Sequence, residues 1–271
     1  MSLRQTNLDK LDRQPFDVLV VGGGINGAVS AAALAAKGAH VGLIDRGDFA
    51  GFTSQQSSNL AWGGIKYLES YEFGLVRKLC TSRNNLLRAF PSSVREIRFF
   101  VNLEQGFRFP SWMMYAATLL YWAIGNFFTR SPRWLSKKQI QAEEPVVDTS
   151  RSIGGVEYSD CYLHDNDSRF VFRFVRQAMN HGCIAANYVE ATEARWDGIY
   201  WQVQARDVRS GRTFDITAKA IVNACGPFAD AFNKQAGQKT RHQHVFSKGV
   251  HLVVDRITPH KRVLTFFADD G

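Results

Sequence analysis

The chain has 271 residues, of which 45% are hydrophobic, and a formal net charge of +8. This is enough for a substantial core in one large or two modest domains. The four cysteines show no C-x-x-C pair and no metal spacing, the first fifteen residues do not resemble a secretion signal, and no apolar stretch reaches transmembrane length. The charge suits an anionic cofactor, substrate or membrane face, and no nucleic-acid-binding signature accompanies it. We therefore expect a cytoplasmic protein with reduced thiols, no nucleic-acid partner and no metal site.

A glycine-rich segment near the start predicts a nucleotide site. Val18 to Val21 form an apolar run typical of a buried parallel strand. Gly22, Gly24 and Gly27 follow at G-x-G-x-x-G spacing, which permits a tight turn, close backbone approach to a pyrophosphate, and close contact between helix and strand. The small residues from Ala28 to Ala36 predict a closely packed helix, whose N-terminus favours an anion.

A second strand, from Val41 to Ile44, completes this strand-helix-strand unit. Asp45 at its end lies eighteen residues past Gly27, where a carboxylate can accept hydrogen bonds from both ribose hydroxyls and disfavours a 2′-phosphate. An ordinary strand-to-helix turn is the alternative. The fingerprint predicts an α/β dinucleotide-binding domain but leaves FAD and NAD open.

A polar loop follows the second strand. It carries hydroxyl and amide side chains and then a pair of glycines: Thr53, Ser54, Ser57, Ser58, Asn59, Gly63 and Gly64. Such a loop can wrap a phosphate and a ring. A helix N-cap followed by a solvated loop explains the same residues equally well.

The middle of the chain is apolar, aromatic and basic. Residues 75–90 have helical periodicity and end before Pro91. Pro110 introduces a second helix over residues 111–128, which is apolar nearly all round and flanked by arginines and lysines. It is either a buried helix of a substrate domain or a segment at a membrane interface, where aromatic rings anchor and cations meet headgroups.

The second half alternates helix and strand. Asp167 or Ser168 can cap a helix from Arg169 to Asn180. The expected strands are 183–189, a meander over 192–196, 200–206 and 213–217, a buried strand over 220–224, and an apolar strand over 252–254. A helix over 228–236 follows Gly226 and Pro227, and Asp270-Gly271 reads as a hairpin turn.

Several sequence blocks resemble the flavin-dependent glycerol-3-phosphate dehydrogenases, in the superfamily that shares the D-amino-acid oxidase fold. The matching blocks occur in family order: 22–27, Thr53-Ser54, 57–60, 63–69, 71–73, 157–161, 223–228 and 248–254. The resemblance selects FAD over NAD. It implies an α/β, Rossmann-like FAD-binding domain with a second, mixed α+β substrate domain that is incomplete here.

The resemblance also implies site residues. Val189 would contact adenine through its backbone, and residues 224–226 would line the adenosine and pyrophosphate side. With the motif, the expected cofactor-binding residues are Gly22, Gly24, Ile25, Asn26, Gly27, Asp45, Arg46, Thr53, Ser54, Ser57, Ser58, Asn59, Trp62, Gly63, Gly64, Val189, Ala224, Cys225 and Gly226.

His251 and Lys66 are the expected catalytic residues. His251 would act in substrate binding or proton transfer, and the Lys66 ammonium would hold a phosphate or stabilise a developing anion. A structural or exposed histidine and a surface lysine are the alternatives. The family usually has histidine at the position of Trp62, so this chain either uses another proton-transfer group or has changed substrate.

The expected function is oxidation of sn-glycerol 3-phosphate to dihydroxyacetone phosphate with hydride transfer to FAD. By resemblance, electrons pass to quinone at a membrane, which allows a peripheral location on the inner face of the cell membrane. The alternatives are an amine or amino-acid oxidase of the same fold, and a catalytically silent FAD- or membrane-binding module. An oxygen-using oxidase and a homodimer also stay open.

We expect the FAD-binding domain to comprise residues 1–75 and 151–240. Residues 76–150 would form a helical, aromatic insertion of the substrate domain, and residues 241–271 the start of its sheet. Because the family's chains continue beyond this point, we expect this chain to bind FAD weakly and to turn over slowly by itself.

Overall fold

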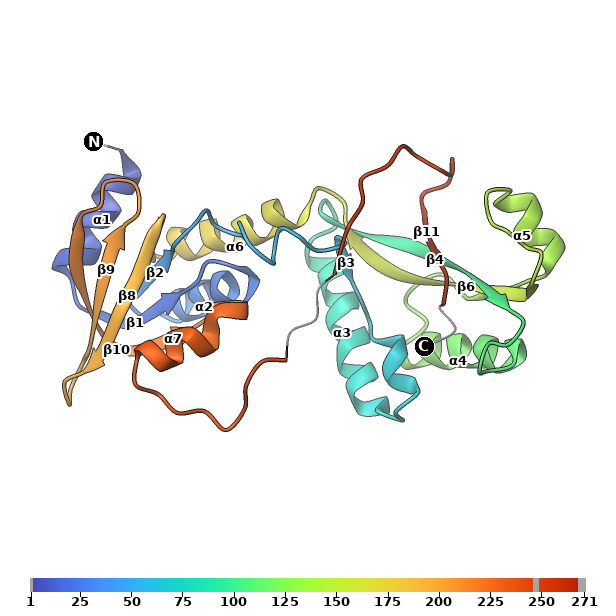
Figure 1. The fold of residues 1–271 in the computed structure, drawn as a ribbon, viewed down its shortest axis with the longest axis horizontal. Coiled ribbons are helices and arrows are strands. Elements are labelled where there is room, and N and C mark those ends of the chain that lie inside the picture. Colours follow the sequence, from blue (N-terminus) through green and yellow to red (C-terminus); the bar gives the residue numbers. More distant parts are fainter. Residues whose placement is uncertain (1, 246–248, 268–271) are drawn as a thin grey trace. The chain divides into compact units, whose positions relative to one another are not determined.

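The computed structural model describes residues 2–245 and 249–267, and the chain divides into two compact units (Figure 1). The first unit comprises residues 1–57 and 165–250, and the second comprises 58–164 and 251–271. These units differ from the expected domains, whose boundaries follow residues 75, 150 and 240, whereas the units change after residues 57, 164 and 250. Residues 58–75 and 151–164 belong to the second unit because their strands pair with each other, with Leu60 opposite Tyr162.

The first unit is built on a sheet of six strands within the described residues, in the order β7-β2-β1-β10-β9-β8. The strands are β1 (Phe16–Val21), β2 (Val41–Asp45), β7 (Ile184–Asn187), β8 (Val189–Trp196), β9 (Trp201–Asp207) and β10 (Thr213–Asn223). β7, β2, β1 and β10 run parallel, and β9 and β8 continue the sheet antiparallel. Parallel neighbours joined through helices give the expected Rossmann-like arrangement.

Helices cover this sheet: α1 (Leu3–Arg13), α2 (Ile25–Ala36), α6 (Asp167–Asn180) and α7 (Ala229–Gln235), the last preceded by the 3₁₀ turn η2 (Gly226–Phe228). α2 packs on α6 through a buried cluster that includes Ala28, Ala31 and Val175. Small side chains on α2 allow this close approach. α1 was not expected from its polar sequence, yet Leu8 and Leu11 are fully buried.

Three expected elements of this unit need correction. The side chain that caps α6 is Asn166, rather than the expected Asp167 or Ser168, and it accepts a hydrogen bond from the Arg169 backbone N–H. The expected strands over 213–217 and 220–224 form one continuous strand, β10. Its first half pairs with β9 and its second half pairs with β1. The expected strand over 183–189 ends at Asn187, and Tyr188 has a positive φ of 55°.

The second unit contains a sheet with the order β11-β4-β6-β3, and β5 also pairs with β6. Its strands are β3 (Leu60–Ala61), β4 (Val94–Glu104), β5 (Arg133–Leu135), β6 (Ser152–Leu163) and β11 (Arg262–Thr265). Its helices are the 3₁₀ turn η1 (Ile65–Leu68), α3 (Phe73–Ala89), α4 (Ser111–Ile124) and α5 (Lys137–Glu143). The mixed α+β character agrees with the expected class of the second domain.

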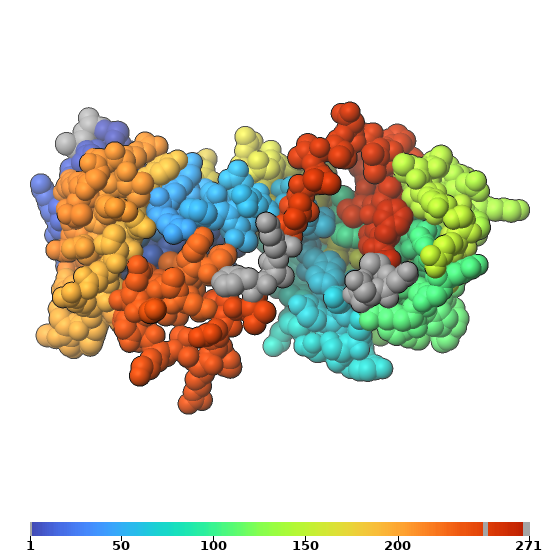
Figure 2. All heavy atoms as spheres, in the orientation of Figure 1, coloured from blue at the N-terminus to red at the C-terminus, as the bar shows by residue number. Residues whose placement is uncertain are grey.

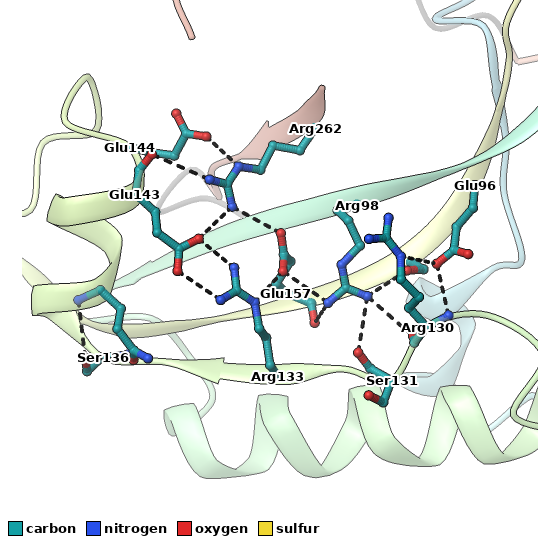
Figure 3. Close-up of polar contacts among 12 residues, drawn as sticks. Glu96, Arg98, Arg130, Ser131, Arg133, Ser136, Glu143, Glu144, Glu157 and Arg262 are labelled. Atoms are coloured by element: carbon teal, nitrogen blue, oxygen red, sulfur yellow. Dashed lines mark hydrogen bonds and ion pairs between the residues drawn. The ribbon is translucent and has the colours of Figure 1, made fainter. Parts of the chain in front are cut away.

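A cluster of three arginines and three glutamates joins β4, β5, β6, α5 and β11 (Figure 3). Arg262 of β11 pairs with Glu143 at 3.0 Å, with Glu157 at 3.2 Å and with Glu144. Arg133 shares Glu143 and Glu157, and Arg98 shares Glu157. Glu143 thus pairs with two arginines and Glu157 with three, so the cluster fastens the short β11 to the body of the second unit.

α4 corresponds to the expected apolar helix, but it ends at Ile124. Only Thr118 and Tyr121 of α4 are buried, whereas Trp112, Leu120 and Met113 are 66%, 44% and 37% exposed. Tyr121 belongs to the core of the second unit, and Met114 and Tyr115 pack against that core. The helix is therefore only partly buried among the described residues, and both expected alternatives, a buried helix and a membrane-interface segment, stay predictions. No helix among the described residues is long and apolar enough to cross a bilayer.

The expected strand over residues 252–254 is not present in the structure. Leu252 and Val253 lie in an irregular, exposed segment, drawn in red in Figure 2. Apolar sequence favours a strand only where a partner strand supplies hydrogen bonds, and no such pairing involves these described residues. The expected turn at residues 270–271 lies outside the described residues.

Candidate cofactor site

The glycine-rich loop connects β1 to α2 in the first unit. Gly22 has a φ of +107°, which disfavours any side chain, and hydrogen-bonds through its N–H to the carbonyl of Ile44 on β2. A Cβ atom on Gly27 would lie 1.8 Å from the carbonyl oxygen of Gly22. Residue 27 must therefore be glycine for the helix to begin this close to the loop.

Asp45 ends β2 and orders this loop and the next one. Its Oδ2 accepts the Gly23 N–H at 2.6 Å, and its Oδ1 accepts the Gly47 N–H at 2.8 Å. Burial raises the pKa of this carboxyl group, and the two backbone hydrogen bonds oppose that rise. Each carboxylate oxygen keeps a further lone pair. Asp45 thus organises the loops and still presents acceptors where a ribose is expected.

The N-terminus of α2 points its first backbone N–H groups toward the same region. Helix geometry leaves these groups without intrahelical partners, and they favour an anion. Ser54, from the polar loop after β2, accepts the Ile25 N–H through its Oγ at 3.0 Å. The hydroxyl proton of Ser54 stays available for donation. This end of the helix therefore combines the features of a pyrophosphate site.

A cavity of about 310 Å³ opens beside these groups. Twelve of the expected cofactor-binding residues line it: Gly22, Gly24, Ile25, Asn26, Asp45, Arg46, Thr53, Ser54, Val189, Ala224, Cys225 and Gly226. Gly27 lies behind the loop, where it allows the close packing described above. Segments that are far apart in sequence, from β1, β2, β8 and the turn after β10, thus meet at one cavity, and its size lies within the usual range for ligand sites.

Sequence reasoning missed the aromatic wall of this cavity. The Arg46 guanidinium lies 3.9 Å from the centre of the Phe228 ring and 5.0 Å from that of Phe52, and the two rings meet edge to face at 5.9 Å. Phe52 and Phe228 are far apart in the chain, and each alone reads as an ordinary loop aromatic. Glu190 and Gln235 also line the cavity and were not expected.

Cys225 lies at the cavity as a thiol, with its Sγ hydrogen-bonded to the Val21 carbonyl at 3.4 Å. Burial raises the pKa of Cys225 to about 11, so the group is a neutral thiol at physiological pH. It therefore contributes shape and weak polarity rather than a nucleophile.

The other expected site residues are not among those that line this cavity. Ser57 belongs to the first unit, where its hydroxyl donates to Asp167. The remaining residues belong to the second unit: Ser58, Asn59, Trp62, Gly63, Gly64, Lys66 and His251. Trp62 is 39% exposed and its ring contacts that of Tyr67, with ring centres 6.0 Å apart.

The two expected catalytic side chains are both exposed. Lys66 lies on η1 and His251 in the irregular segment that precedes β11. No hydrogen bond or ion pair of either side chain is found with the residues that the structure describes. Their catalytic roles stay predictions.

The donor set of the first unit fits a dinucleotide such as FAD. Backbone N–H groups at a helix N-terminus suit the pyrophosphate, Asp45 suits the ribose, and aromatic and apolar groups suit the adenine. Gly27 lies so close to Gly22 that no side chain fits at position 27, and the loop therefore presents only backbone where a phosphate would lie. The geometry alone does not choose between dinucleotides.

Comparison with known proteins supplies that choice. Residues 17–270 match the DAO family, described as FAD dependent oxidoreductase. An alpha-glycerophosphate oxidase of Streptococcus pneumoniae is 30% identical over 260 residues, covering 93% of this chain and 42% of the relative. A glycerol-3-phosphate dehydrogenase of Pseudomonas aeruginosa is 34% identical over 247 residues, covering 89% of this chain and 46% of the relative.

Among solved structures, the glycerol-3-phosphate dehydrogenase from Bacillus halodurans complexed with FAD has the same fold, with a TM-score of 0.66 at 23% identity. The match covers 86% of this chain and 38% of that one. The chain thus spans less than half the length of these relatives. Because the family match includes nearly all of its residues, the chain belongs to the DAO family of FAD-dependent oxidoreductases, for which FAD is the cofactor.

Proposed function

We propose that this chain supplies the FAD-binding part of an enzyme that oxidises sn-glycerol 3-phosphate to dihydroxyacetone phosphate. The observation that carries the proposal is the cavity of the first unit, where the glycine-rich loop, Asp45 and the α2 N-terminus meet. The substrate comes from the relatives, whose names specify glycerophosphate or glycerol 3-phosphate. Since this chain covers less than half of their length, its activity and substrate are proposals.

In the proposed mechanism, bound FAD supplies a two-electron acceptor for the hydride at C2 of the substrate. The chain would hold the cofactor through the α2 N-terminus at the pyrophosphate and through Asp45 at the ribose. The imidazole of His251 accepts the proton of the C2 hydroxyl. The Lys66 ammonium binds the substrate phosphate or stabilises the oxygen anion that develops. By family resemblance, the segment 62–64 would contact the flavin.

The test is a visible absorbance spectrum of the 271-residue chain with FAD, recorded anaerobically before and after addition of glycerol 3-phosphate. We expect a bound-flavin band that bleaches, since reduction within one turnover does not need rapid catalysis. A band that persists with glycerol 3-phosphate but bleaches with amino acids would favour the amine or amino-acid oxidase alternative. Bound flavin that no such substrate reduces would favour the silent module.

The electron acceptor is a second part of the proposal. We propose quinone, while the name of the Streptococcus pneumoniae relative, an oxidase, makes oxygen the main competitor. Reoxidation of the bleached protein by a short-chain quinone under anaerobic conditions would support quinone. Quinone would be contradicted if it left the reduced flavin unchanged, while admission of air rapidly restored the oxidised-flavin absorbance and produced hydrogen peroxide.

The exposed face of α4 favours peripheral membrane contact. Trp112, Met113 and Leu120 are exposed on α4, and Phe127 just beyond it is 60% exposed. Basic residues lie nearby, with the Arg88 guanidinium 4.5 Å from the centre of the Phe128 ring. Such a surface suits the interface of an anionic bilayer. Flotation with vesicles containing anionic lipid should carry the chain upward, and Trp112→Ser should weaken that binding.

A homodimer stays an option that sedimentation would test.

A further inference from the structure

The backbone of Gly63 is held from both sides inside the second unit. Its N–H donates to Asp160 Oδ1 at 3.0 Å, and its carbonyl oxygen accepts from the Cys80 thiol at 3.6 Å. A Cβ atom at this position would lie 2.1 Å from the Tyr121 hydroxyl oxygen. The segment 62–64 is therefore fixed by hydrogen bonds and by the absence of a side chain at its centre.

Asp160 is the centre of this arrangement. It lies on β6 with no exposed surface and accepts from Arg83 of α3 at 3.0 Å and from the Tyr121 hydroxyl of α4 at 2.9 Å. Arg83 is itself 2% exposed, and two of its other donors bind the Asn84 side chain. α3, α4 and β6 thus all contribute side chains to a single connected network around Gly63.

A purely structural role explains this network poorly. Removing a carboxylate and a guanidinium from water costs several kcal/mol per ion, and an apolar side chain of similar size often stabilises the fold more. Burial raises the pKa of Asp160 to about 6, while Arg83, Tyr121 and the Gly63 N–H lower it. What the carboxylate provides, and an apolar residue would not, is a fixed acceptor for the Gly63 N–H.

We propose that Asp160 is a positioning residue, which together with Arg83 and Tyr121 fixes the backbone of segment 62–64 for contact with the flavin. This inference rests on the proposed function, which assigns that contact to the segment. Trp62 and Gly64 flank the held residue, and Gly64, with a φ of +82°, begins η1, which carries Lys66. A shift of Gly63 would therefore move both the flavin-facing backbone and the proposed substrate-binding ammonium.

The test compares Asp160→Leu with Glu157→Met, because an asparagine at position 160 would keep an acceptor oxygen for the Gly63 N–H. Both residues lie on β6, both are buried, and both pair with an arginine, but only Asp160 contacts Gly63. We expect Asp160→Leu to speed hydrogen exchange at the Gly63 amide, followed by NMR, by at least about tenfold. We also expect it to slow anaerobic bleaching by glycerol 3-phosphate by about 10- to 100-fold. The FAD dissociation constant should change less than about threefold, because the first unit holds the adenosine and pyrophosphate.

The control Glu157→Met should lower the melting temperature to a similar extent and leave both readouts within about twofold. If Asp160→Leu does not fold, Tyr121→Phe removes one donor from the carboxylate and keeps the ring, and should shift both readouts in the same direction. Unchanged Gly63 exchange in a folded Asp160→Leu variant, or equal slowing by Glu157→Met, would overturn the proposal. Absence of bleaching in the unsubstituted chain would refute the proposed function, whereas the exchange readout would still test Asp160.

Discussion

The first unit makes its binding site from backbone groups, and the second unit fixes its interior with charged side chains. At the cavity beside β1, the groups that face the expected phosphates are N–H groups of the loop and of α2, and one carboxylate orders the loops. In the second unit, Asp160 and Glu157 each serve an arginine in the interior. An atom added to the backbone loop should therefore weaken cofactor binding, whereas removal of one charged partner from the interior should lower the stability of the fold.

The largest effect should follow from adding one methyl group to the backbone site. Gly27→Ala places a carbon 1.8 Å from the Gly22 carbonyl oxygen, so the loop or the helix must move. We expect the FAD affinity to fall at least about 100-fold, equivalent to about 3 kcal/mol, in equilibrium titration. Gly74→Ala is the control, since its φ is not positive and its Cβ would meet nothing within 4 Å. Equal affinity of the two variants would show that the loop is not a tight cradle.

Removing a cation from the charged interior should have the next largest effect. Arg262→Met leaves Glu144, Glu157 and Glu143 with fewer partners, and Glu144 has no exposed surface. We expect the free energy of unfolding to fall by about 3 kcal/mol in urea titration, because an uncompensated carboxylate stays buried.

Arg195→Met is the matched control for this variant. Arg195 pairs with Glu193 at 2.7 Å, but the two side chains are 76% and 44% exposed. Its removal should cost less than about 1 kcal/mol. If both variants lose the same stability, the buried cluster contributes no more than a surface pair.

The same contrast separates what the sequence predicts from what it misses. β1, α2 and β2 were predicted closely because their signals are local: an apolar run, glycines at fixed spacing and a run of alanines. The twelve cavity residues follow from that motif and from the family resemblance. By contrast, Arg83 and Asp160 are 77 residues apart, and nothing near either residue indicates the other.

Patterns that depend on distant partners also account for the errors. β10 was divided into two strands because its pattern changes where its neighbour changes from β9 to β1. The apolar residues Leu252 and Val253 predicted a strand, yet a strand needs a partner as well as apolar side chains. Phe52 and Phe228 became a cavity wall only when the fold brought two loops together.

A charged contact in the first unit should give a pH-dependent effect of intermediate size. Burial opposes ionisation of Asp207, but hydrogen bonds from Arg4 and Ser210 outweigh it and lower the pKa to about 2. Because the folded-state pKa lies below the unfolded one, Asp207 stabilises the fold above about pH 4 and loses this contribution as the pH falls toward 2.

Asp207→Asn should therefore lower the free energy of unfolding by about 2 kcal/mol at pH 7, and by progressively less between pH 4 and pH 2. Urea unfolding at several pH values measures this difference. Asp255→Asn, at an exposed acid, is the control and should leave stability unchanged at each pH. A difference between Asp207→Asn and the unsubstituted chain that is independent of pH would contradict the account of the Arg4 contact.

The smallest effect should come from a single hydroxyl at the backbone site. Ser54 accepts the Ile25 N–H and can donate its own proton to a phosphate, so Ser54→Ala removes one bond in the free protein and one more in the complex. We expect the FAD affinity to fall about fivefold, or about 1 kcal/mol, and stability to fall by a similar amount. Ser2→Ala removes an equivalent contact to the Gln5 N–H of α1, away from the cavity. It should cost similar stability and leave FAD affinity unchanged, so weaker binding in both variants would mean that Ser54 acts only through helix capping.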